Sequence, residues 1–189
     1  MLNRIIRRIV LPGASRVGEV PAKRHRWRYE GMLSAISVGF FLILIGVLFI
    51  TTPNLLKNIQ DFLNSFKINQ VPSTNIYFPT PKTLADPNAL NVYQAARQFS
   101  VIWGIFLVAM LGARLILGST LHRLSENIGD IVFWLGAAYV IQTLLVATTQ
   151  ASTIDTTIWF RFWALIVALI GVSLIARGVF LAAARLRHA

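Results

Sequence analysis

Four long apolar stretches dominate this chain and restrict what it can fold into. They cover residues 32–51, 98–118, 129–149 and 158–182. The hydrocarbon core of a bilayer is about 30 Å thick, and a helix that rises about 1.5 Å per residue crosses it in about 20 residues. The sequence therefore predicts an all-α fold, a four-transmembrane-helix bundle.

The composition agrees with a membrane protein. Hydrophobic residues make up 56% of the chain and charged residues only 13%, a balance that leaves a water-soluble protein too little polar surface. The formal charge of +11 is concentrated at the ends of the apolar stretches, which favours membrane topology and anionic lipid over nucleic acid as its explanation. The absence of cysteine excludes disulfides and thiolate chemistry.

The distribution of basic residues predicts the orientation. Thirteen of the eighteen lysines and arginines fall on one side if the stretches cross alternately, and such an excess marks the cytoplasmic side. We expect a cell-membrane protein with both termini in the cytoplasm. Residues 1–31 form a basic arm, and residues 32–189 form the membrane domain, including an outer loop at 52–97. The first stretch is too long for the core of a cleaved signal peptide.

The arm has two predicted parts. In residues 1–11 the apolar side chains recur at helical spacing, which predicts an amphipathic helix at the membrane surface. Further on, Arg24, Arg26 and Arg28 alternate with Trp27 and Tyr29, residue types that settle at the lipid headgroups. These arginines are candidate contacts for anionic lipid on the inner face, with a simple anchoring and topology role as the alternative.

The outer loop predicts a second amphipathic helix and an irregular segment. Residues 54–67 carry an apolar and a polar face, with Thr52 placed as a cap and Pro53 at the first helical position. Four prolines within residues 72–87 forbid a continuous helix there, so we expect this segment to be ordered by packing and not by its own secondary structure. Asp86–Pro87 then predicts the start of a helix that continues through the second stretch. The resulting outer cap either binds a partner or shields helix ends.

Catalytic and cofactor signals are scarce. The three histidines, His25, His122 and His188, lie in inner-side polar segments, where they cannot hold a haem between helices. Asp130 and Asp155 lie at the ends of stretches, away from the depth at which ion-coupled transporters use carboxylates. No nucleophile elbow, phosphate loop or metal-ligand spacing is present. We therefore expect no enzyme activity, no cofactor and no metal.

One weak polar cluster is predicted near the inner ends of the stretches. Arg114, Arg177 and Asp130 lie at similar depths. The two arginines are candidate lipid or anion contacts, and Arg114 is a candidate ion-pair partner of Asp130 across the tight turn. Arginines that extend to the membrane surface are the ordinary alternative.

A second weak cluster lies in the third stretch. Tyr139, Gln142 and Thr143 share one helix face through i, i+3 and i+4 spacing. An unpaired amide in lipid is costly, so Gln142 must face protein or water. A hydrogen bond to a neighbouring helix is the ordinary explanation for an intramembrane polar contact of this kind, and a solute pathway is the alternative.

Two functional interpretations follow. The leading one is a non-enzymatic structural or accessory subunit of a larger membrane complex, with membrane lipids and other membrane protein subunits, or a second copy, as partners. The alternative is a small oligomeric transporter or channel. An enzyme acting on lipid is disfavoured by the missing catalytic groups. Small residues four apart, as in Ala164/Ala168 and Gly178/Ala182, permit close helix contact in either case.

Overall fold

The computed structural model describes residues 20–71, 74–81, 86–151 and 155–186. The chain divides into two compact units, residues 1–37 and 38–189, which we describe separately. In the first unit, the described residues belong to helix α1 (Val20–Thr51), so the segment with the three arginines at positions 24–28 is helical. The predicted boundary at residue 31 falls inside this helix. The amphipathic helix predicted for residues 1–11 lies outside the described residues.

Four helices of the described residues are long and apolar enough to cross a membrane, as predicted. They are α1, α3 (Pro87–Ile116), α6 (Thr156–Leu186), and a continuous helix made of α4 (Leu121–Val140), η3 (Ile141–Val146) and α5 (Ala147–Gln150). Each extends beyond its predicted apolar stretch at one or both ends. The 30 residues of α3 give a length of about 45 Å, well over the hydrocarbon thickness.

The ends of α3 follow from its sequence. The Asp86 carboxylate accepts a hydrogen bond from the backbone N–H of Asn88 at 3.0 Å, and Pro87 begins the helix. This confirms the predicted start, because a carboxylate cap and a proline both suit the first turn. After the other end, Gly118 has a φ of 66°, a left-handed conformation that glycine adopts without strain.

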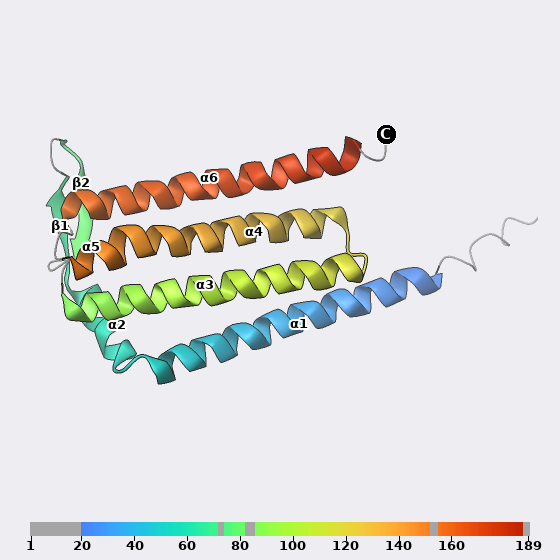
Figure 1. The fold of residues 1–189 in the computed structure, drawn as a ribbon, viewed down its shortest axis with the longest axis horizontal. Helices are drawn as coiled ribbons and strands as arrows, with labels where there is room; N and C mark the ends of the chain where they lie inside the picture. The colour runs from blue at the N-terminus through green and yellow to red at the C-terminus, as the bar shows by residue number, and fades with distance from the viewer. Residues whose placement is uncertain (1–19, 72–73, 82–85, 152–154, 187–189) are drawn as a thin grey trace, which may run out of the picture. The chain divides into compact units, whose positions relative to one another are not determined.

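Helix α4 lies between α3 and α6 in the second unit (Figure 1). Two glycines allow these close approaches. A Cβ added at Gly104 of α3 would lie 2.9 Å from Cγ of Leu135, and one added at Gly136 of α4 would lie 3.3 Å from Cγ of Leu169. Small residues let membrane helices approach closely, and the resulting van der Waals packing drives their association because the hydrophobic effect does not act between helices in lipid.

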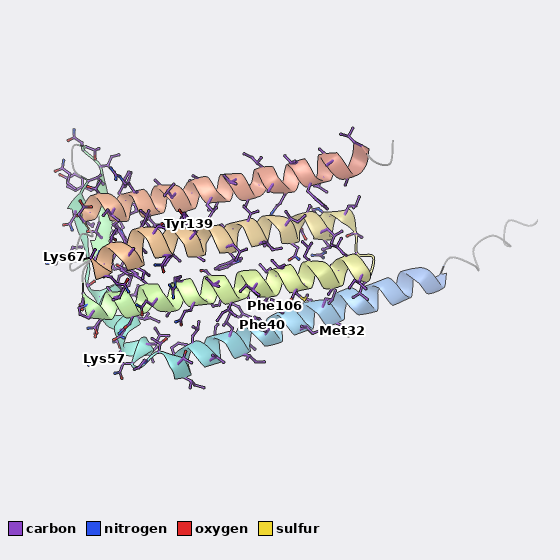
Figure 2. All side chains as sticks on the ribbon, viewed as in Figure 1. Met32, Phe40, Lys57, Lys67, Phe106 and Tyr139 are labelled. Atoms are coloured by element: carbon purple, nitrogen blue, oxygen red, sulfur yellow. The ribbon has the colours of Figure 1, made fainter. Side chains whose placement is uncertain are left out.

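Aromatic side chains join α1 to α3. Within the second unit, the Phe40 and Phe106 rings stack with centroids 4.1 Å apart, and the Phe41 and Trp103 rings meet edge to face at 5.5 Å. Figure 2 labels the first pair where these two helices run side by side.

The outer loop begins with helix α2 (Leu55–Asn64). The prediction that Thr52 caps this helix was wrong. The N-cap is Asn54, which has a left-handed φ of 53° and makes no side-chain cap, while the Thr52 carbonyl accepts a bond from the backbone N–H of Leu55 at 3.3 Å. Pro53 therefore lies in the turn before the helix. Only Thr52, Pro53 and Asn54 separate the end of α1 at Thr51 from the beginning of α2 at Leu55.

Only part of the apolar face predicted for α2 is buried. Leu55 is buried, and Ile59 packs partly buried against the same apolar cluster. Leu56 and Leu63 are 68% and 61% exposed. Asn58, assigned by the sequence to the polar face, is buried and donates to the Pro53 carbonyl at 3.4 Å. One flank of the helix thus contacts α3, and the other remains open.

The segment after α2 forms a hairpin, which corrects the prediction of an irregular chain. Strand β1 (Phe66–Gln70) pairs antiparallel with β2 (Tyr77–Pro81). The prolines of β2 are compatible with a strand because this sheet has only two strands, and an edge strand can spare some N–H donors. The sequence predicts that the apolar side chains Ile76, Tyr77 and Phe78 order this segment by packing. Phe78 contacts Phe160, whereas Ile76 and Tyr77 are exposed.

Trp159 is at the centre of the aromatic core that joins these outer elements. It is 3% exposed, and its indole N–H donates to the Pro79 carbonyl of β2 at 3.0 Å. Its neighbours come from α2, β1, α3 and α6; those with ring contacts are Phe62, Phe66, Tyr93, Phe162 and Trp163. This one side chain of α6 thus contacts α2, β1, β2 and α3.

Candidate functional site

A π-helical segment interrupts the third span where Gln142 stands. The segment η3 covers Ile141–Val146, and α-helix continues on both sides of it. A π turn carries an extra residue and changes the direction of the side chains near it, which is why such turns are frequent at functional sites. Thr143 points away from any neighbouring helix, because it is exposed and its hydroxyl donates to the Tyr139 carbonyl at 2.9 Å.

Gln142 has a partner on the neighbouring helix. Its side-chain carbonyl accepts a hydrogen bond from the guanidinium of Arg97 on α3, and both side chains are partly buried. Of the three residues predicted to form an intramembrane polar contact, Gln142 alone makes a bond to another helix. Tyr139 is 71% exposed.

An open groove lies beside this bond, between α3 and α4. Its volume is about 420 Å³. One end is polar, with Arg97 and Gln142, and the rest of the lining is largely apolar; its other residues are Gln98, Val101, Ile102, Leu135, Ala138 and Tyr139. Sequence reasoning missed Arg97 as a site residue, because it was counted only as an outer-side charge.

A second polar site is formed by α4 and α6. The Arg177 guanidinium donates to the Asp130 carboxylate at 2.5 Å. To reach it, the Arg177 stem crosses Gly129: a Cβ added at Gly129 would lie 2.5 Å from Cγ and 2.8 Å from Cδ of Arg177. A side chain at position 129 would thus occupy the path that Arg177 takes.

This pairing differs from the expected one between Arg114 and Asp130. Arg114 donates instead to the backbone carbonyl of Arg123 at 3.2 Å. Arg114 is still near enough to Asp130 for an electrostatic interaction, as is Arg177. The three predicted residues therefore lie close together, but Asp130 forms its ion pair with Arg177 and not with Arg114. The beginning of α4 also carries two ion pairs to Glu126, from His122 and Arg123, each at 3.4 Å.

Asn127 is a buried polar residue that sequence reasoning missed. It is 2% exposed, and its amide donates to the Leu107 carbonyl of α3 at 3.1 Å. Its need for a partner was not visible in the sequence, because Asn127 precedes the stretch predicted at residues 129–149, whereas the helix itself begins at Leu121. Its bond ties α4 to α3 and offers no free group for chemistry.

The other predicted residues lie apart from these sites. Arg24, Arg26 and Arg28 belong to α1, but their side chains are not among those described. Within the described residues, no three histidine, aspartate or glutamate side chains gather as a metal-ion site.

A comparison with protein-family models, curated proteins and solved structures finds no match for this chain. The class of protein therefore rests on its own features. Four long apolar helices are compatible with a multi-pass membrane protein.

Proposed function

We propose that this chain is a non-enzymatic structural or accessory subunit of a larger membrane complex. The observation that carries the proposal is the face of α6 opposite α4. Leu169 and Arg177 of α6 contact α4 at its glycines. Gly171 and Gly178 follow Leu169 by two and nine residues, which places them about 200° and 180° around the helix from it, so they point away from α4.

Five small residues and Ile175 line this opposite face of α6 at spacings of four and three. We call it the α6 stripe; it consists of Ala164, Ala168, Gly171, Ile175, Gly178 and Ala182. A Cβ added at Gly171 or Gly178 meets nothing within 4 Å. Close-packed membrane helices place small residues at such spacings, because the backbones can then approach. The stripe therefore supports a contact with a helix from another subunit.

Enlarging the stripe is expected to break the complex without unfolding the chain. Because the space beside both glycines is open, Gly171→Leu and Gly178→Leu together should leave the monomer folded. After mild-detergent purification, native mass spectrometry should show the wild type with a different membrane protein at fixed stoichiometry and the double variant without it. Gly112→Leu is the matched control, since position 112 on α3 is equally open.

The alternative is a small oligomeric transporter or channel. The polar groove with Arg97 and Gln142 favours it, because a cation in a span can serve a solute path. The same purification distinguishes the two functions. A stable assembly of this chain alone, with an aqueous pore in planar bilayers, would replace the accessory role. A monomer without any partner would reject both.

The outer loop and the inner arginines complete the proposal. Residues 52–97 would cap the outer ends of the spans; the contacts of α2 with α3 and of β2 with α6 support this role. On the inner side, anionic lipid headgroups would be held by basic residues of the arm and spans; these are Arg24, Arg26, Arg28, Arg114 and Arg177.

Labelling of introduced cysteines is expected to show that both termini lie on the cytoplasmic side of the cell membrane. The chain has no cysteine, so single replacements at Ser15, Thr74 and Arg187 give an unambiguous readout. Because basic residues are concentrated on the proposed inner side, an impermeant maleimide should label position 74 on intact cells. It should label positions 15 and 187 only after the membrane is opened. Labelling of position 15 on intact cells would reverse the orientation.

A further inference from the structure

We propose that the groove between α3 and α4 beside Arg97 binds one anionic phospholipid of the outer leaflet. The phosphate would contact Arg97, and the beginning of one acyl chain would lie along the apolar lining. This site is independent of the accessory role, because it needs no protein partner; its assignment to the outer leaflet rests on the proposed orientation of the chain.

The charge of Arg97 has no carboxylate partner in the described part of the chain. The ion pairs there join Glu126 to His122 and Arg123, and Asp130 to Arg177. Arg97 donates through one nitrogen to the neutral amide of Gln142. A guanidinium has five N–H donors, so most of them remain for an anion. A phosphodiester fits this need, since arginine binds phosphate through two parallel hydrogen bonds.

The spacing of charges on α3 places Arg97 near the level of lipid phosphates. Arg97 and Arg114 are 17 residues apart on one helix, which corresponds to about 25 Å. The hydrocarbon core is about 30 Å thick, so a straight helix cannot hold both arginines outside it. With Arg114 at the inner end of α3, Arg97 lies at the outer edge of the hydrocarbon, just below the headgroups.

The groove has the polarity of a lipid in that leaflet. Its polar end, at Arg97 and Gln142, is nearer the outer ends of both helices, since α3 begins and α5 ends on that side. The apolar end, at Ile102 and Leu135, is about 8–10 Å deeper. A phospholipid places its phosphate outward and its acyl chain inward in the same sense. A volume of about 420 Å³ holds a headgroup region and part of a chain, not a whole lipid.

The lining favours a net negative lipid over a zwitterionic one. Among the described residues that line the groove, Arg97 is the one that carries a charge. A zwitterionic headgroup would bring an ammonium group that finds no carboxylate there, whereas a lipid of net charge −1 compensates the arginine. Tyr139 also lines the groove, and its hydroxyl can donate to phosphate or glycerol oxygens.

Native mass spectrometry of the full chain with added phosphatidylglycerol or phosphatidylcholine tests the site. We expect the wild type to retain one phosphatidylglycerol at about tenfold lower lipid concentration than phosphatidylcholine. Arg97→Gln should weaken phosphatidylglycerol binding about tenfold or more, as expected for loss of a charge-assisted contact. Arg161→Gln is the matched control, because Arg161 is an exposed arginine near the outer end of α6 that does not line the groove.

A second variant keeps the test decisive if Arg97→Gln fails to fold. Val101→Trp should fill the groove from an exposed position while both Arg97 and Gln142 are retained; it should also abolish lipid retention. Unchanged binding in both variants would overturn the site, and equal retention of the two lipids would overturn its preference for anionic lipid. Displacement of the lipid by inorganic phosphate alone would assign the groove to a solute anion. A lipid-free dimer that Val101→Trp dissociates would assign it to a second copy.

Discussion

Trp159→Ala is expected to lower the free energy of unfolding by about 3–5 kcal/mol, the usual loss for a large aromatic residue removed from a core. Trp159 is almost fully buried and contacts rings from four elements. The alanine would leave a cavity among these rings and remove the hydrogen bond to the Pro79 carbonyl. Chemical unfolding in detergent, followed by circular dichroism, measures the loss.

Two matched variants separate packing from the hydrogen bond. Trp159→Phe keeps most of the ring volume and removes the indole donor, so it should cost about 1–3 kcal/mol, because the Pro79 carbonyl loses its partner. Trp163→Ala removes the same residue type from a position that is 41% exposed on the same helix, and it should cost much less than Trp159→Ala. Similar losses at positions 159 and 163 would contradict the aromatic core described here.

The four spans could be predicted because their signal is local. Each depends on the length and composition of one stretch, and the membrane sets both. The start of α3 was equally local, since the Asp86 cap and Pro87 lie next to each other. The hairpin could not be predicted in the same way. Its pairing joins Phe66 to Pro81; the prolines excluded a continuous helix there, but they did not indicate which segment would pair with β2.

In the candidate sites, too, local features could be predicted from the sequence and long-range partners could not. The sequence indicated that Gln142 needs a partner, because an amide in lipid must be satisfied. It did not indicate Arg97, because the choice of partner depends on how α3 and α4 align. Asp130 is a similar case. Arg114 was favoured as the nearest arginine across the turn, but Gly129 opens a path for Arg177 from α6.

The Asp130–Arg177 ion pair gives the second large effect. Arg177→Gln or Asp130→Asn alone should lower the free energy of unfolding by about 2.5–3.5 kcal/mol, because each leaves the other charge unpaired in a membrane span. The two losses should not add, since the double variant has no charge left to compensate. Arg114→Gln should cost less than about 1 kcal/mol, because Arg114 bonds a backbone carbonyl at the helix end and can extend to the headgroups.

Gly129 provides an independent test of the same pair. Gly129→Ala should destabilise the wild type by about 1–3 kcal/mol, because its Cβ would overlap the Arg177 stem and force it to move. In an Arg177→Ala background the stem is absent, so the same change at position 129 should be nearly neutral. Reconstituted protein unfolded under identical conditions gives all four free energies of this cycle. Additive effects at positions 129 and 177 would mean that the Arg177 stem does not cross Gly129. A large loss of stability in Arg114→Gln would instead identify Arg114 as the ion-pair partner of Asp130.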